Sequence, residues 1–260
     1  MRTEVFLDYS PVTRADWWKE HVQYSKFNRQ GIDITCASFE HSNSTAKANI
    51  IFLTGWNETF LKYNILIETL YENGYNVYTY DHQSQGLSER WLTEIQSTWV
   101  NTFDDYVDDF CYFVSEYPDK SIPNYVLTHS IGGLIAAIAM SRFPSLINRA
   151  CLCSPMFRNK CGMKCFDFKY PLPQPVAYWL TFISCKLGLG VMHAIGYFKE
   201  ESTDILPLNI YTSDREQLDL WQELRMKYPN IISCCPTNDW VLHHFFNRLL
   251  LQSLTHLFPR

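Results

Sequence analysis

The stretch that decides the fold is NYVLTHSIGGLIAAIAM, residues 124–140. Its first part, ending at Thr128, is an apolar run typical of a buried strand, and its second part, from Ile131, consists of small and aliphatic residues that favour a helix. A serine between such a strand and helix, with glycine two residues later, is one residue away from the G-x-S-x-G turn that exposes a nucleophile. We therefore predict that Ser130 is a nucleophile, and an ordinary helix N-cap is the alternative.

Outward from this stretch, strand-like and helix-like segments alternate between residues 49 and 155. Apolar strands joined by helices predict the α/β class, with a mostly parallel sheet covered by helices on both faces. The expected strands are 49–53, 75–80, 124–128 and 147–153, and the expected helices are 58–73, 98–117 and 131–143. Upstream, residues 11–30 have a helix-like pattern that leads through Gly31 into a strand at 32–39.

A nucleophilic serine needs hydrogen-bond donors for the oxyanion that develops during acyl transfer, and preorganised backbone N–H groups serve this purpose well. We expect one donor to be the N–H of Ile131, at the head of its helix. The loop after the strand 49–53 lies at the same edge of the sheet, because functional loops follow the carboxyl ends of parallel strands. We predict the N–H of Trp56 as the second donor, with Gly55 allowing close approach; a simple strand-to-helix turn is the alternative.

The composition excludes several classes of protein. The chain has 260 residues, of which 47% are hydrophobic and 19% charged, so it can bury a core and is neither disordered nor fibrous. Its net charge of −5 argues against a nucleic-acid partner. Residues 1–18 lack the apolar run of a signal peptide, so reduced cysteines are expected.

Four of the cysteines raise the question of a metal site. A zinc site built from them would have irregular spacing, so buried, inert thiols are the favoured interpretation, and we expect neither a metal nor a cofactor. The four are Cys151, Cys153, Cys161 and Cys165.

Residues 156–198 differ in composition from the rest of the chain. They carry five basic residues and one acidic residue, a net charge of +4 that leaves −9 for the remainder. Within them, residues 176–198 form a mostly apolar stretch long enough to span a bilayer, but Lys186 in its middle makes a span costly. We expect a lid or interfacial segment that meets an anionic membrane surface. The expected organisation is a core at 1–155, a cap at 156–235 and a return helix at 236–260.

Several motifs in order carry a family resemblance. They are GWNET (55–59), DHQSQGLS (81–88), HSIGG (129–133), SPMF (154–157), TSDR (212–215) and PTNDW (236–240). Together they resemble the bacterial lysophospholipases (lecithinase B), α/β-hydrolases near the monoacylglycerol lipases. The resemblance implies an α/β-hydrolase fold with an inserted cap, hydrolysis of the acyl ester of lysophospholipids to a fatty acid and a glycerophosphodiester, and a peripheral location on the cytoplasmic side of the inner membrane.

The sequence departs from the family pattern at two places. The family usually has Arg-Gly where this chain has Gln83-Ser84, and Gly or Ala where it has Thr128. Because arginine is an always-charged donor with several N–H groups, its loss weakens the anchoring of the 81–90 loop. Neither change touches the nucleophile.

The general base and its orienting acid are the missing part of the predicted site. In this fold they follow the serine in the order acid, then histidine. The resemblance places them on strands after the cap, whereas residues 239–260 offer only a helix-like stretch. We therefore expect the base, the acid and the last strands of the sheet beyond Arg260, as in a C-terminally truncated chain. Asp239 and His243, four residues apart on one helix face, are a weak alternative pair.

The sequence is also compatible with two other functions. One is a non-catalytic, membrane-associated protein, either a truncated product or a pseudoenzyme. The other keeps a serine ester hydrolase but changes the substrate to monoacylglycerol or another ester.

Overall fold

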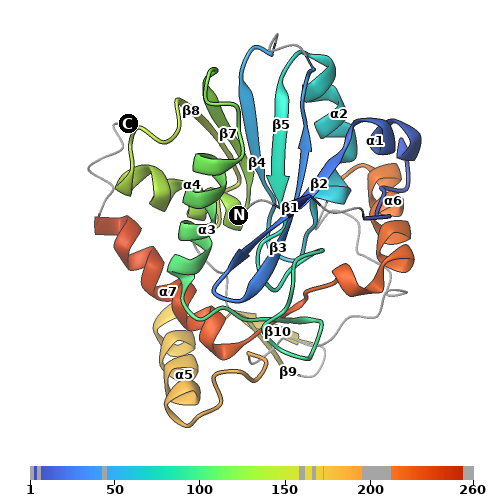
Figure 1. Ribbon diagram of the computed structural model, residues 1–260. Helices are drawn as coiled ribbons and strands as arrows, with labels where there is room; N and C mark the ends of the chain where they lie inside the picture. The colour runs from blue at the N-terminus through green and yellow to red at the C-terminus, as the bar shows by residue number, and fades with distance from the viewer. Residues whose placement is uncertain are drawn as a thin grey trace.

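The computed structural model describes residues 3–4, 7–42, 46–157, 162–165, 168–171, 173–194 and 212–253. Its centre is a seven-stranded sheet with the strand order β1-β2-β3-β5-β4-β7-β8, and helices cover both faces (Figure 1). The strands are β1 (Thr3–Glu4), β2 (Gln23–Arg29), β3 (Ile32–Phe39), β4 (Asn49–Leu53), β5 (Asn76–Tyr80), β7 (Asn124–His129) and β8 (Arg149–Cys153). This architecture confirms the predicted α/β class.

The parallel half of the sheet holds the predicted functional loops. Strands β5, β4, β7 and β8 run parallel, with Leu53 opposite Tyr80 on one side and opposite Thr128 on the other. Every residue of β4 and β5 is buried, as expected for strands covered on both faces. The loops after Leu53, Tyr80, His129 and Cys153 therefore emerge at one edge, which we call the carboxyl edge.

Two apolar clusters occupy the two faces of the sheet, and β3 and β5 contribute residues to both of them. Tyr78 and Tyr80 of β5 join a cluster with α3 and α4, whereas Val77 joins a cluster with α1, α2 and α6. The helices that belong to these layers are α1 (Ala15–His21), η1 (Phe60–Tyr63), α2 (Asn64–Glu72), α3 (Phe103–Glu116), α4 (Ile131–Arg142), α6 (Arg215–Lys227) and η2 (Pro229–Ile231). The helices expected at 58–73 and 131–143 are thus confirmed. The helix expected at 98–117 is confirmed from Phe103 onward, whereas Ser97–Thr98 forms strand β6.

The expectation of a helix over residues 11–30 was wrong in its second half. Helix α1 ends at His21, and residues 23–29 form β2, which pairs with β3 from Gln23↔Ser38 to Arg29↔Ile32. The two residues between the strands, Gln30 and Gly31, have φ of 55° and 93°. Two consecutive positive φ values are typical of the tight turn that joins two antiparallel strands. Hairpin pairing, which a single segment does not reveal, therefore overrides the helix-like spacing.

Strand β8 is one of the two edge strands of the sheet within the described residues, and most of its side chains are exposed. Cys151 and Cys153 lie on the same side of it, with their sulfur atoms 4.0 Å apart. The prediction of buried thiols is therefore wrong for these two residues, because no further strand covers them in the described part of the chain. Cys161 lies outside the described residues.

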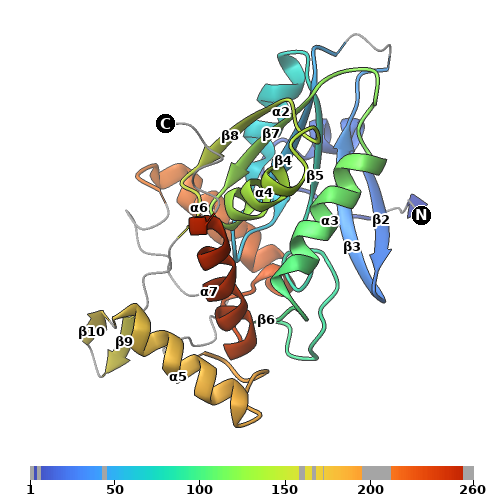
Figure 2. The same cartoon turned by 90° about the vertical axis from the view of Figure 1, so that its left-hand side faces the viewer.

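The remaining elements lie around and beyond the carboxyl edge (Figures 1 and 2). They are the hairpin β9 (Gly162–Cys165) and β10 (Phe168–Pro171), helix α5 (Gln174–Lys186), the short parallel pair β6 (Ser97–Thr98) and β11 (Cys235–Pro236), and helix α7 (Asn238–Ser253). Within the described ranges, no helix has the length and hydropathy that a membrane crossing requires. The division into core, cap and return helix stays a prediction.

Candidate active site

Ser130 sits in a strained turn between β7 and α4. Its φ of 51° and ψ of −115° are unfavourable for a residue with a side chain, so the surrounding structure must hold it there. The Ser130 N–H donates to the Cys153 carbonyl at 3.1 Å, and its own carbonyl accepts from the N–H of Met156 at 2.9 Å. Hydrogen bonds to the end of β8 and to the loop after it thus fix the turn.

The two glycines after Ser130 allow the helix to approach the sheet. A Cβ atom at Gly132 would lie 2.7 Å from Leu53 Cβ and 2.8 Å from the Thr54 carbonyl oxygen. A Cβ atom at Gly133 would lie 2.7 Å from Pro155 Cβ. All three distances are shorter than the contacts that real Cβ atoms make, so the close packing of α4 on the ends of β4 and β8 requires glycine at both positions.

The structure accommodates threonine at position 128, where the family usually has glycine or alanine. Its side chain is buried, and its Oγ1 lies 3.2 Å from where a Gly133 Cβ would be. Among the described residues this hydroxyl has no hydrogen-bond partner. The absent side chain of Gly133 therefore makes room for Thr128, at the cost of a buried unsatisfied hydroxyl.

The loop that carries the predicted second oxyanion donor is anchored on both sides of Trp56. The Trp56 indole donates from Nε1 to Thr98 Oγ1 at 3.0 Å. Asn57, with φ of 58°, donates its N–H to Gln85 Oε1 at 2.9 Å, and its Oδ1 accepts from the N–H of Ser233 at 2.7 Å. The predicted donors Trp56 and Ile131 thus belong to neighbouring strand ends, those of β4 and β7.

A buried carboxylate connects these two strand ends. Glu58 Oε2 accepts from the Gly55 N–H at 2.6 Å and lies 2.9 Å from His129 Nδ1, while Oε1 accepts from Lys62 Nζ at 2.5 Å. Burial raises the pKa of Glu58, but the hydrogen bond with His129 and the charge of Lys62 outweigh it and lower the pKa to about 2. Glu58 is therefore ionised and joins the oxyanion loop to the residue before the nucleophile.

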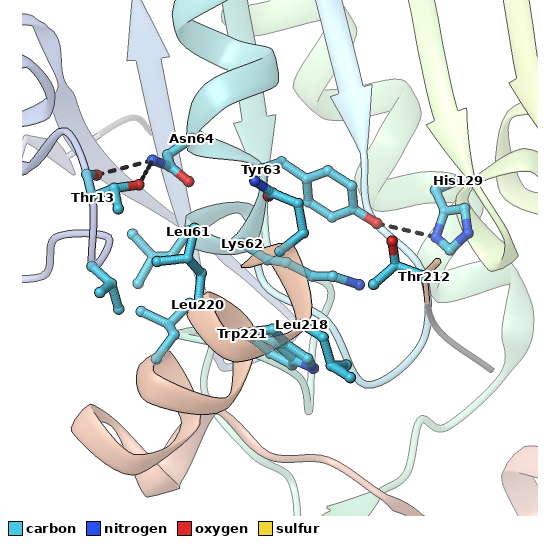
Figure 3. A pocket seen from close by; sticks show the side chains of 13 residues that line it. Thr13, Leu61, Lys62, Tyr63, Asn64, His129, Thr212, Leu218, Leu220 and Trp221 are labelled. Atoms are coloured by element: carbon cyan, nitrogen blue, oxygen red, sulfur yellow. Dashed lines mark hydrogen bonds between the residues drawn. The ribbon is translucent and has the colours of Figure 1, made fainter. Parts of the chain in front are cut away.

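Tyr63 completes this group, which we call the Glu58 cluster (Glu58, Lys62, Tyr63 and His129). Its hydroxyl donates to Glu58 Oε2 at 2.7 Å and lies 3.1 Å from His129 Nδ1 (Figure 3). Burial and the neighbouring Glu58 charge raise the pKa of Tyr63 well above its ordinary value, so the phenol stays protonated and keeps its donor.

A cavity of 290 Å³ lies beside the Glu58 cluster, between η1 and α6 (Figure 3). Lys62, Tyr63 and His129 line the end next to the cluster, and the rest is lined by apolar side chains, mostly leucines and Trp221, and by the uncharged polar residues Thr13, Asn64, Thr212 and Gln217. Lys62 Nζ lies 5.4 Å from the centre of the Trp221 ring. Because Lys62 is already paired with Glu58, the end next to the cluster carries little net charge.

No described side chain hydrogen-bonds to the Ser130 hydroxyl. The weak candidate Asp239 accepts from Trp99 Nε1 at 3.1 Å, and burial lowers the pKa of His243. His244 Nε2 lies 3.2 Å from the Met156 carbonyl oxygen. The structure thus places the candidate acid and base on partners other than the nucleophile.

The loop after β5 is built on Asp81, whose carboxylate accepts from Thr59 Oγ1, Phe60 N–H and Leu87 N–H at 2.7–2.9 Å. In the same loop His82 Nε2 lies 3.2 Å from the Thr54 carbonyl oxygen, and burial lowers its pKa to about 4. These contacts give both residues an anchoring role.

The two departures in this loop have identifiable consequences. Gln83 Nε2 donates to the buried Asp109 Oδ2 at 2.6 Å, and Arg29 Nε lies 3.5 Å from Asp109 Oδ1. Ser84 has φ of 61°, a conformation that glycine adopts without strain. The chain therefore has a neutral amide against a buried carboxyl where the family resemblance expects an arginine, and serine where the backbone favours glycine.

A serine on a strained strand–turn–helix at the carboxyl edge of a mostly parallel sheet defines the α/β-hydrolase class of serine hydrolases. The chain belongs to the family described as serine aminopeptidase, S33, which matches residues 44–221.

Individual relatives agree with this assignment. Lysophospholipase L2 of Escherichia coli (strain K12) is 25% identical over 242 residues, which cover 92% of this chain and 68% of that protein. A probable lysophospholipase L2 of Haemophilus influenzae is 28% identical over 200 residues, covering 76% and 60%. A solved structure of a soluble variant of monoglyceride lipase from Saccharomyces cerevisiae aligns with a TM-score of 0.63 at 15% identity, covering 96% of this chain and 73% of that one. The last likeness concerns the fold alone.

Sequence reasoning missed the Glu58 cluster as a unit. Glu58 and Lys62 are four residues apart, a spacing that allows a side-chain pair in a helical segment. Their shared partner His129 is distant in sequence, and only the sheet brings it to Glu58.

We predict that Glu58→Gln destabilises the fold by about 2–3 kcal/mol at neutral pH, because it leaves Lys62 without its counter-ion. The folded pKa of about 2 lies below the ordinary value of 4.5, so ionised Glu58 stabilises the fold above pH 4.5, and this contribution is lost as the pH falls from 4.5 to 2. Urea unfolding across this range should show the loss in the wild type and not in Glu58→Gln. The exposed Glu116→Gln is the control, and equal behaviour of the two variants would contradict the account.

Gln83→Arg should stabilise the fold at pH 8 by about 1–2 kcal/mol and by less at pH 5. Burial raises the pKa of Asp109 to about 7, so the stability that its protonated form supports is lost as the pH rises from 3.8 through 7. An arginine at position 83 favours the carboxylate and removes this loss. Thermal unfolding at both pH values tests the prediction, with Gln23→Arg on the exposed side of β2 as the control for added charge. A gain in stability that is the same at both pH values would contradict this explanation.

Proposed function

We propose that this chain hydrolyses the acyl ester of lysophospholipids through Ser130, releasing a fatty acid and a glycerophosphodiester. The observation that carries the proposal is the strained backbone of Ser130 at the carboxyl edge, together with a hydroxyl that is free of intramolecular hydrogen bonds among the described residues. The relatives described as lysophospholipases, which align with most of the chain, support this substrate class.

In the proposed reaction the Ser130 Oγ attacks the ester carbonyl carbon and forms a tetrahedral intermediate. The N–H groups of Ile131 and Trp56 donate to its oxyanion. As the intermediate collapses, the proton of the Ser130 hydroxyl passes by way of the general base to the leaving alcohol, which is the glycerophosphodiester, and an acyl-serine ester remains. Water then hydrolyses this ester, which releases the fatty acid and restores the Ser130 hydroxyl. The Glu58 cluster keeps the loops that carry the two donors at a fixed separation.

We further propose that the general base and the acid come from residues outside the described part of the chain. Support comes from the partners of the described candidates, since Asp239 and His244 hydrogen-bond elsewhere. A serine hydrolase whose base is absent keeps only a residual rate from its oxyanion hole and substrate binding. The proposed core at 1–155 therefore supplies the nucleophile and the oxyanion donors, and the proposed cap at 156–235 covers them.

Release of fatty acid from lysophosphatidylcholine tests the proposal. We expect release that falls at least about 1,000-fold in Ser130→Ala, because the nucleophile is lost. Ser141→Ala, on the same helix but at its other end, is the matched control and should keep the activity. Equal release by the wild type and Ser130→Ala would overturn the proposal, and a clear preference for monoacylglycerol over lysophosphatidylcholine would replace the substrate class.

A further inference from the structure

The outer face of α5 is an unusually apolar exposed surface. Exposed apolar side chains recur along it at spacings of three and four residues, which place them on one stripe of the helix. They are Val176, Trp179, Leu180, Ile183 and, one residue beyond the helix, Leu187. The turn that follows continues the surface with exposed Leu189, Val191 and Met192. We call these eight residues the α5 surface.

The opposite face of α5 already has its partner. Ala177 and Thr181 are buried, and the Tyr178 ring lies 6.0 Å from that of Phe245 on α7. The helix therefore carries two apolar faces, one packed on α7 and one uncovered. A contiguous exposed apolar surface of this kind marks an interaction site, because exposing it to water costs free energy in proportion to its area.

The dimensions of α5 decide how it meets a bilayer. Its 13 residues correspond to about 20 Å, which is too short for a hydrocarbon core of about 30 Å. One face is also committed to α7, so only the other can enter lipid. A helix with these properties lies parallel to the membrane plane, with its apolar face at the boundary between headgroups and acyl chains.

The charges around the surface favour an anionic bilayer. Lys186 lies in the last turn of α5, with its Nζ 5.5 Å from the Phe182 ring centre, next to the apolar stripe. The hairpin of β9 and β10 lies beside α5 (Figure 2), and Lys164 and Lys169 are partners in its backbone register. Basic residues close to a membrane surface favour anionic lipid. The rest of the chain is acidic, so the negative potential of an anionic bilayer repels it and orients α5 toward the membrane.

We propose that the α5 surface docks this protein on the surface of an anionic lipid bilayer, with α5 in the membrane plane and Trp179 at the headgroup level. Docking there places the carboxyl edge, and with it Ser130, on the side of the molecule that faces lipid (Figures 1 and 2). In this respect the inference rests on the proposed function, whose substrate is a membrane lipid. The protein would then be peripheral, and the cytoplasmic leaflet of the inner membrane is the anionic surface we propose.

Sedimentation with vesicles of ether-linked phosphatidylcholine, with and without ether-linked phosphatidylglycerol, tests the inference. Ether lipids have no acyl ester, so binding is measured apart from hydrolysis, and Ser130→Ala should bind like the wild type. We expect Ile183→Ser to weaken binding about tenfold, since it removes an apolar side chain from the bilayer. Lys186→Gln should weaken binding about fivefold on vesicles with phosphatidylglycerol and leave binding to neutral vesicles unchanged.

The matched control is Ile65→Ser on α2, which changes the same residue type at similar exposure, 42% against 51% for Ile183, away from the α5 surface. It should bind like the wild type, and circular dichroism should show that all variants fold. Equal binding by Ile183→Ser and Ile65→Ser would overturn the inference. A wild type that ignores vesicles but is dimeric, with Ile183→Ser monomeric, would also overturn it and assign the α5 surface to self-association.

Discussion

One buried carboxylate holds the candidate site together. Glu58 belongs to the loop after β4, yet it contacts His129 at the end of β7, and it also receives the N–H of Gly55. A Cβ atom on Gly55 would lie 2.5 Å from this carboxylate, so the loop closes only with glycine at that position. Because Lys62 and His129 stabilise the ionised form, the connection persists across the neutral pH range. The separation of the two predicted oxyanion donors depends on this connection.

The same edge of the sheet stores strain. Ser130, Asn57 and Ser84 all have positive φ, and the loops that carry them meet around the nucleophile. Each such residue costs of order 1–3 kcal/mol. At Ser130 the packing of α4, the hydrogen bond that Ser130 donates to Cys153 and the one that it accepts from Met156 must offset this cost. The strained residues therefore lower the stability of the fold at the place where a reacting group needs to be exposed, a pattern typical of active sites. The uncovered α5 surface is a second departure from ordinary globular packing, and it lies beyond the same edge.

Much of this arrangement could be predicted from the sequence, because local signals dictate it. The apolar strands, the small-residue helix after Ser130 and the glycine that ends a helix are sufficient to predict how strands and helices alternate along residues 49–155. The second half of residues 11–30 could not be predicted, since β2 exists only through pairing with β3. The Glu58 cluster could not be predicted either, because His129 is 71 residues away from Glu58 along the chain. The exposure of Cys151 and Cys153 depends on β8 being an edge, which no local pattern reveals.

The central claim is that the turn at Ser130 presents a hydrolase nucleophile. The most direct measurement is mass spectrometry of the folded protein after reaction with a fluorophosphonate, which forms a covalent adduct with activated serines. The account predicts one adduct, on Ser130, that disappears when the protein is unfolded before labelling. An adduct distributed over other serines, or none on Ser130 in the folded chain, would contradict it.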